Sequence, residues 1–293
     1  MKKFSLILIL SGIFLVSCQK DISWDPSVTQ GGGNTDTTGT GGNNSGSLLV
    51  KTVSVQNSES YTTTYTYTAD KKIDVINTTG TSGGLDVGNY RRFYRDATGR
   101  ITRIATKVPP QSGIEVDTVF MNVHYPDAAT FNYDYTVQKI SLSGFDIYDS
   151  TTYTYNANNQ VTEGYTHQYN PILGPVQDLR SVYSYDASGN LIKIEGYNNA
   201  TGNMELTVTF DLEYDNKTNP AAFDKQEMLV SGGNPGSSKN NVTVMTFKDV
   251  AGNEPEQIIN NVYTFGSNGL PSKVVATDQS GFNPVTTTTF YYQ

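Results

Sequence analysis

The chain has 293 residues, and its 28 Asp and Glu outnumber its 20 Lys and Arg, which gives a formal net charge of −8. This balance argues against a nucleic-acid partner, because a phosphate backbone would be repelled. The single Cys excludes a disulfide framework and a Cys-based zinc site. With 20 Tyr and 12 Phe the chain is too aromatic to be disordered, and its abundant Thr, Asn and Gly favour strands and turns.

The first residues are typical of a secretory signal. Lys2 and Lys3 precede an apolar run over 4–16, which is shorter than the roughly 20 residues needed to span a bilayer. The segment 15–18 (Leu-Val-Ser-Cys) resembles the bacterial lipoprotein box, which implies cleavage between Ser17 and Cys18 and lipid on Cys18. We therefore expect a signal peptide over 1–17 and a membrane contact through the Cys18 lipid. The alternative is an ordinary signal peptide with an incidental Cys.

Residues 18–47 form a predicted linker. Its part over 31–47 has no large side chain, so burial cannot offset the entropy lost on ordering. The tripeptide 19–21 (Gln-Lys-Asp) resembles the short Lys/acidic tag that directs Bacteroidota lipoproteins to the cell surface. We expect a lipid-anchored protein on the outer face of the bacterial outer membrane, with a periplasm-facing anchor as the alternative.

Residues 48–293 are uniform in composition and are expected to form one domain. Over 206–214 every even position is apolar and every odd one polar, which predicts an antiparallel strand with one wet face. One strand per ~15 residues gives an all-β antiparallel meander of about 16 strands. A sheet of that width must curve strongly, close into a barrel or fold into two layers. At most one short helix is expected, near 220–229, where Asn219 and Pro220 form a helix start.

A short unit recurs along this domain. Its best copy is 183–191 (Tyr-Ser-Tyr-Asp-Ala-Ser-Gly-Asn-Leu), and related copies lie at 93–101, 153–161 and 263–270. Asp at the first turn position and Gly at the fourth predict a hairpin with a type I turn and a Gly bulge. The unit lacks the acidic residues of a calcium loop, so no metal site is predicted.

The Tyr-x-Tyr-Asp-x-x-Gly unit resembles the YD repeat of rearrangement-hotspot proteins. Together with the lipoprotein box, the linker and the turns at 214–220 and 267–271, it makes the chain similar to Bacteroidota lipoproteins that carry a domain of unknown function described as having a porin-like fold. This resemblance covers about 48–293. It implies a large barrel-like sheet, and it supplies no activity, cofactor or catalytic residue.

The remaining question is function. His124 and His167 lack the spacing of a metal motif, and no phosphate loop or Gly-x-Ser-x-Gly motif occurs, so we predict a protein that is not an enzyme and needs no cofactor. We expect an extracellular binding or scaffolding module for a glycan or an envelope protein. Aromatic rings stack on sugars, and the candidate stacking residues are Tyr183, Tyr185, Tyr291 and Tyr292.

Three alternatives stay open. Each of these tyrosines can instead belong to the cross-strand packing of the hairpins. The chain can be an outer-membrane β-barrel with a pore-like role, an alternative that its aromatic end at 290–292 favours and its Thr-rich strands oppose. It can also be a hydrolase whose Ser, His and Asp are brought together only in space.

Overall fold

The computed structural model describes residues 47–57, 59–82, 85–86, 88–107, 117–142, 145–199, 202–220, 222, 226, 229–230, 238–250, 252 and 254–293. The predicted signal peptide 1–17, the cleavage site between Ser17 and Cys18, the lipid on Cys18 and nearly all of the linker 18–47 lie outside the described residues. These assignments therefore stay predictions.

Strands make up almost all of the described domain. They are β1 (Leu49–Gln56), β2 (Glu59–Tyr67), β3 (Ile73–Ser82), β4 (Leu85–Asp86), β5 (Asn89–Arg95), β6 (Ile101–Lys107), β7 (Thr118–His124), β8 (Tyr135–Leu142), β9 (Phe145–Tyr155), β10 (Val161–Asn170), β11 (Gly174–Tyr185), β12 (Leu191–Asn198), β13 (Glu205–Thr218), β14 (Asn240–Asp249), β15 (Gln257–Phe265), β16 (Pro271–Asp278) and β17 (Thr286–Tyr292).

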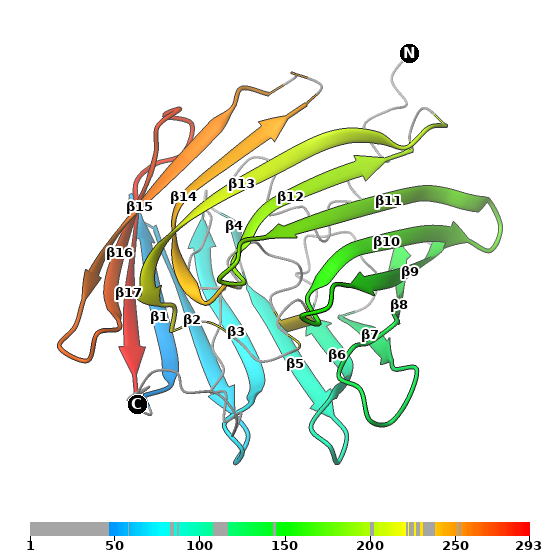
Figure 1. Ribbon diagram of the computed structural model, residues 1–293, viewed down its shortest axis with the longest axis horizontal. Helices are drawn as coiled ribbons and strands as arrows, with labels where there is room; N and C mark the ends of the chain where they lie inside the picture. Colours follow the sequence, from blue (N-terminus) through cyan, green and yellow to red (C-terminus); the bar gives the residue numbers. More distant parts are fainter. Residues whose placement is uncertain are drawn as a thin grey trace.

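The sheet closes on itself. Successive strands pair antiparallel, and β17 returns to pair with β1 (Figure 1). Leu48 and Gln293 exchange two backbone hydrogen bonds of 2.9 Å beside this closing pair. Because β4 pairs only with the end of β3, while β3 pairs directly with β5, 16 strands form the barrel wall within the described residues. The predicted antiparallel meander of about 16 strands is confirmed, and closure is how its apolar face is buried.

The repeated unit forms the hairpins at one end of the barrel. Because neighbouring strands alternate in direction, the connections after β2, β5, β9, β11 and β15 lie at the same end, which we call the turn end. Gly99, Gly189 and Gly269 have φ values of +87°, +88° and +77°. In the best copy, Gly189 N donates to Asp186 O (3.0 Å), and Asp186 N donates to Asn190 O (2.9 Å). The predicted type I turn with a Gly bulge is confirmed.

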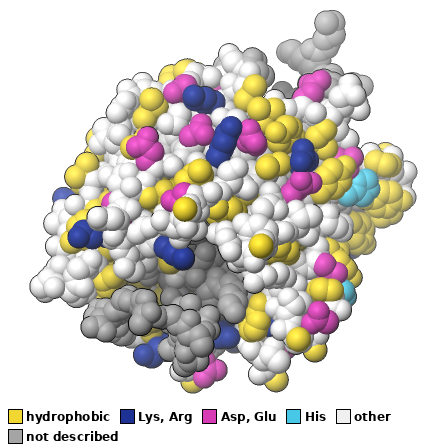
Figure 2. All heavy atoms as spheres, viewed as in Figure 1, with side chains coloured by type: hydrophobic (Ala, Val, Ile, Leu, Met, Phe, Trp, Pro, Cys, Tyr) yellow, Lys and Arg dark blue, Asp and Glu magenta, His cyan; other side chains and the backbone are white. Residues whose placement is uncertain are grey.

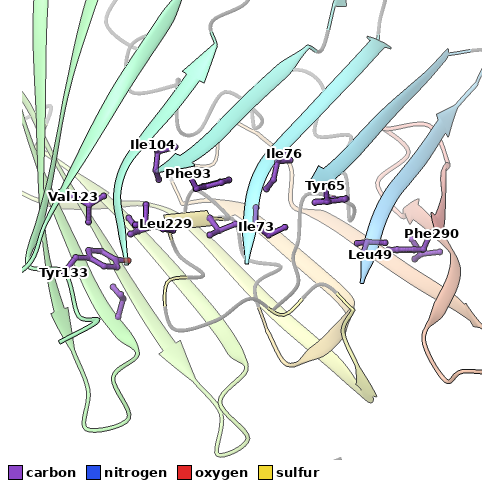
Figure 3. Close-up of a cluster of buried hydrophobic side chains, with 14 residues drawn as sticks. Leu49, Tyr65, Ile73, Ile76, Phe93, Ile104, Val123, Tyr133, Leu229 and Phe290 are labelled. Carbon is purple, nitrogen blue, oxygen red and sulfur yellow. The ribbon is translucent and has the colours of Figure 1, made fainter. Parts of the chain in front are cut away.

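Alternation along the strands separates an inner wall from an outer wall. The inner wall is apolar at the turn end and polar beyond it, as at Thr52, Thr63 and Gln138, and the outer wall mixes charged, polar and exposed aromatic side chains. Leu49, Ile76, Phe93, Ile104 and Phe290 belong to one buried cluster that draws on strands from β1 to β17 and lies at the turn end, as Figure 3 shows. A second buried cluster lies inside β12–β16. On the face drawn in Figure 2, acidic and basic side chains are instead scattered over the surface. The barrel is therefore filled with its own core at the turn end.

The described residues Gln226, Leu229 and Val230, in the connection from β13 to β14, lie against β5 and β6 on the opposite wall. Leu229 and Val230 are buried in the first cluster, and Figure 3 shows Leu229 among the inward side chains of the early strands. Arg91 on β5 donates from Nη1 to Val230 O (2.6 Å) and from Nη2 to Leu229 O (2.8 Å). Gln226, which is fully buried, accepts a hydrogen bond at Oε1 from Ile101 N (3.0 Å) and donates to the hydroxyl of Tyr125. We call this segment the crossing segment.

The expectation of at most one short helix near 220–229 is confirmed within the described residues. Pro220, Ala222 and Gln226 lie in turns or irregular backbone, and the described helical residues are Leu229 and Val230. The sequence predicts a helix cap at Asn219, but the Asn219 side chain donates to Ser238 O (2.9 Å) and joins the two ends of the connection. Within the described ranges, no helix is long and apolar enough to cross a membrane.

Candidate binding surface on the outer wall

Tyrosines at the ends of the strands fasten the turn end from inside. Tyr185 at the end of β11 donates its hydroxyl to Val161 O (2.8 Å), the first residue of the preceding strand β10. Among the described residues the same bond recurs around the barrel: Tyr67 to Leu49 O (2.6 Å), Tyr125 to Ile101 O (2.8 Å), Tyr155 to Tyr133 O (2.7 Å), Tyr214 to Leu191 O (2.5 Å) and Tyr292 to Pro271 O (2.6 Å). We call these tyrosines the latch tyrosines.

On one strand an arginine occupies the position of a latch tyrosine. On β5 the corresponding position is Arg95, whose Nη2 donates to Ile73 O (3.3 Å). Burial raises the pKa of the latch tyrosines Tyr67 and Tyr155 well above the ordinary value, so these hydroxyls stay protonated as donors. The second Tyr of the repeat therefore has a structural role.

The four predicted stacking residues lie on different sides of the barrel wall. Tyr183 packs against the inner clusters, and Tyr185 and Tyr292 are latch tyrosines, so three of the four lie on the inner wall. Tyr291 faces outward with 42% of its area exposed, and Lys51 Nζ lies 4.1 Å from its ring centroid. The placement of the first three favours the packing alternative, while Tyr291 keeps an accessible ring.

A group of exposed rings lies elsewhere, on the outer wall of β7–β10. Tyr135 and Tyr165 are each 36% exposed and Tyr169 is 41% exposed. We call this surface the aromatic wall, and its members are His124, Tyr135, Tyr148, Tyr165, His167 and Tyr169. Part of it lies where Figure 2 shows histidine among apolar side chains at one edge. These tyrosines were not predicted from the sequence. Alternation shows which residues of a strand share a face, but it does not show whether that face lies inside or outside the barrel.

The strand register aligns these rings. His124 pairs with Tyr135, Tyr135 with Thr152, and Thr152 with Tyr165 across β7, β8, β9 and β10. Two strand spacings separate Tyr135 and Tyr165, about 9.5 Å at the backbone. Thr152, whose side chain is much smaller than a tyrosine ring, lies between them, so the outer surface is lower between the two rings than at the rings. Such a row resembles the ring platforms on which successive sugars of an extended chain can stack.

Both histidines are held by a carboxylate and a ring. His124 Nδ1 lies 2.7 Å from Asp134 Oδ1, and its ring stacks on Tyr135 at 4.4 Å between centroids. His167 Nδ1 lies 2.6 Å from Asp178 Oδ1, and its ring lies 6.4 Å from that of Tyr169. The carboxylate partner favours the tautomer with a proton on Nδ1. These contacts fix the imidazoles as flat, exposed parts of the wall.

One arrangement bears on the hydrolase alternative. Ser150 on β9 and Asp178 on β11 are the cross-strand neighbours of His167 on β10, so Ser, His and Asp stand side by side on the outer wall. Among the described residues, no hydrogen bond joins Ser150 to His167. The group lies on the outer face of the barrel, where the His167 side chain is 46% exposed, whereas an acyl-transfer site excludes water and aims backbone amides at the reacting carbonyl. The arrangement does not form an acyl-transfer site.

The inner wall carries one buried acid that the sequence did not single out. Asp149 pairs across the sheet with Gln138 and Gln168, and its Oδ2 accepts from Gln138 Nε2 (2.8 Å). Among the described residues its Oδ1 has no hydrogen-bond partner, and burial raises the pKa of this carboxyl. No group of three or more His, Cys, Asp or Glu suited to a metal ion occurs in the part of the chain that the structure describes.

The fold places the chain among large antiparallel β-barrels. Comparison with protein-family models and with curated proteins gave no match. Two solved structures are similar: a porin-like protein from Bacteroides uniformis ATCC 8492 (TM-score 0.50, 9% identity, covering 84% of this chain and 96% of that one) and a porin-like protein from Bacteroides vulgatus ATCC 8482 (TM-score 0.51, 10% identity, covering 84% and 99%). At these identities the likeness concerns the fold alone. It agrees with the porin-like fold implied by the resemblance, and membership of a lipoprotein family stays a prediction.

Proposed function

We propose that the chain is a lipid-anchored barrel of the outer membrane that stands in water and binds a glycan or an envelope protein on its outer wall, without a catalytic role. The observation that supports this proposal is the direction of its polarity. A membrane-spanning barrel turns an apolar band about 25 Å tall toward lipid and a polar wall inward. The described barrel instead holds two apolar clusters inside, beside buried polar side chains such as Thr63 and Gln138, and carries ion pairs on its outer wall.

Ion pairs on the outer wall favour contact of that wall with water. Lys139 pairs with Asp146 at 2.7 Å, Arg180 with Glu163 at 2.7 Å and Lys193 with Glu195 at 2.9 Å, all within or beside the strands of the wall. Each is worth little in water, where about 0–1 kcal/mol is typical of an exposed pair. Facing lipid, each Lys or Arg near the bilayer midplane would cost about 2–4 kcal/mol. A wall of this composition is suited to solvent.

A second candidate function is an outer-membrane β-barrel with a pore-like role. The comparison with two porin-like proteins favours it over a binding module, because a closed barrel is the shape that this alternative expects. The crossing segment and the core at the turn end weigh against an open passage, since buried side chains from opposite walls meet there. The two proposals differ in whether the wall contacts lipid, and that difference can be measured.

The test compares membrane retention with and without the lipid. The full chain is expressed in a bacterium with its own signal, and in parallel with Cys18→Ala behind an ordinary cleavable secretory signal. We expect the native form to incorporate a labelled fatty acid and to sediment with outer membranes. We expect the Cys18→Ala form to appear in the soluble envelope fraction. Retention of the Cys18→Ala form in membranes after carbonate and urea washes would support the spanning barrel instead.

The side of the membrane is a separate question. We propose the cell surface, on the basis of the tag-like residues 19–21 and the long linker 18–47. Protease treatment of intact cells should remove the native form while leaving a periplasmic marker whole. Survival of the full-length protein until the cells are lysed would place it in the periplasm.

A further inference from the structure

A second outer surface adjoins the aromatic wall and differs from it in charge. It lies on β5, β6 and the start of β7, and alternates basic side chains with rings. We call it the cationic strip, and its members are Tyr90, Arg92, Tyr94, Arg103, Lys107 and Phe120. Three cations, Arg92, Arg103 and Lys107, therefore lie close together on the outer wall of a chain with a formal charge of −8.

The rings hold the cations in place. The Arg103 guanidinium lies 4.5 Å from the ring of Tyr94 and 4.9 Å from that of Phe120. Lys107 Nζ lies 5.4 Å from the ring of Tyr90, its direct partner across β5 and β6. A cation–π contact of this kind orients a basic side chain, contributes about 0.5–1 kcal/mol at an exposed site, and leaves its charge uncompensated.

Charge compensation separates two cations of the strip, Arg103 and Lys107, from Arg92 in the same strip and from the cations of the neighbouring wall. Lys139 and Arg180 each have a carboxylate at 2.7 Å, and Arg92 has Asp74 at 3.6 Å. Arg103 and Lys107 have exposed side chains, and no ion-pair partner for either occurs among the described residues. Within the described ranges, Arg103 and Lys107 are therefore two exposed cations that rings hold in place and no carboxylate pairs with.

The spacing of these cations indicates the form of the ligand. Arg103 and Lys107 are four residues apart on one strand, about 13 Å. One compact anion cannot contact both, whereas an extended polymer can. A nucleic acid places a charge every ~1.7 Å and would be repelled by the acidic remainder of the protein. A polysaccharide that carries acidic groups on its sugar rings can contact both cations and can also use the exposed faces of Phe120 and the tyrosines.

We propose that the cationic strip binds an acidic polysaccharide, one whose sugar rings carry carboxylate or sulfate groups. This inference rests on the proposed function, which it narrows from glycans in general to anionic ones. Arg103 and Lys107 contact the acidic groups. The polymer continues onto the aromatic wall, whose nearest strand, β7, also carries Phe120.

The test uses the full chain, extracted in a mild detergent, with polygalacturonate and dextran sulfate as probes and uncharged dextran as their counterpart. The strip variant is Arg103→Gln with Lys107→Gln. The matched control is Lys193→Gln with Lys248→Gln, which removes the same charge from exposed positions away from the strip. Thermal unfolding by circular dichroism verifies that both variants fold. Affinity is measured by gel retardation over a range of salt concentrations.

We expect both acidic probes to bind native protein and control alike, and to bind the strip variant about tenfold more weakly, since two exposed ion pairs are lost. The binding should weaken as salt rises. Equal affinity of strip variant and native protein would overturn the inference. So would comparable binding of uncharged dextran, although that result would leave the proposed glycan module intact. If none of the three polymers bound, the inference and the glycan proposal would fail together.

Vesicles of phosphatidylglycerol form a further arm of the test. Binding of these vesicles in place of the polymers would overturn the inference and would assign the strip to a membrane surface.

Discussion

Arg91 is the side chain whose removal tests the crossing segment most directly. It stands on the inner face of β5 and donates to the carbonyl oxygens of Val230 (2.6 Å) and Leu229 (2.8 Å). Arg91→Met keeps the aliphatic stem and removes both donors. The neighbouring Arg92→Met is the matched control, because Arg92 faces outward and its one acid, Asp74, lies at 3.6 Å.

The expected magnitude follows from these bonds. A hydrogen bond from a charged donor contributes about 1.5–3 kcal/mol, and its loss leaves a carbonyl unpaired. The loss of stability should be smaller than the sum of the two hydrogen bonds, because Arg91→Met also removes the desolvation cost of a buried guanidinium. We expect Arg91→Met to lower the free energy of unfolding by about 2–4 kcal/mol. Arg92→Met should cost less than about 1 kcal/mol.

Urea unfolding followed by far-ultraviolet circular dichroism measures this difference. With a slope of about 3 kcal/mol/M, the unfolding midpoint of Arg91→Met should fall by roughly 1 M, while that of Arg92→Met should move only slightly. Equal midpoints for the two variants would refute the reasoning, because the crossing segment would then contribute nothing through Arg91. A lowered slope would show that the native state had loosened.

Three further outcomes are expected. Tyr155→Phe removes a latch hydroxyl and should lower the free energy of unfolding, measured in urea, by about 1 kcal/mol. Tyr148→Phe on the outer wall should leave it unchanged. Equal decreases for the two variants would show that the latch hydroxyl does not stabilise the barrel. Gly189→Ala should cost about 1–2 kcal/mol, because the turn needs a positive φ, and Gly189→Asn should cost less, since Asn159 has φ +59° at the same place in its turn; the reverse order of melting temperatures would count against the bulge. Burial raises the pKa of Asp149, so the ionised form is penalised in the fold and stability should fall as pH rises through that pKa. Asp149→Asn should flatten this dependence, and an unchanged slope of stability against pH would contradict it.

Local chemistry was predictable because it acts within a few residues. The turn at 186–189 follows from Asp and Gly at their positions, and the structure has the expected φ at Gly189. The strand at 206–214 follows from alternation that needs no partner to be recognised. The number of strands follows from their average length, since antiparallel hairpins leave little chain unused.

The candidate site was not predictable in the same way. Alternation divides a strand into two faces without saying which one is inside, and Thr-rich strands blur even that division. Tyr291 and Tyr292 are adjacent, yet one is exposed beside Lys51 and the other is a latch tyrosine. The aromatic wall depends on register across several strands, and a shift of one residue would turn its rings inward.

The sequence alone determined that this chain is an antiparallel all-β protein with Tyr-Asp-x-x-Gly hairpins, and it predicts a secreted, lipid-carrying N-terminus. Those conclusions depend on composition and short spacing. Tertiary structure decided the closure of β17 on β1, the side of the wall that each ring occupies, and the contact of Arg91 with a segment about 140 residues away. The physical reason is that closure and inner packing join residues remote in sequence, whose pairing is selected by the burial of the whole apolar wall.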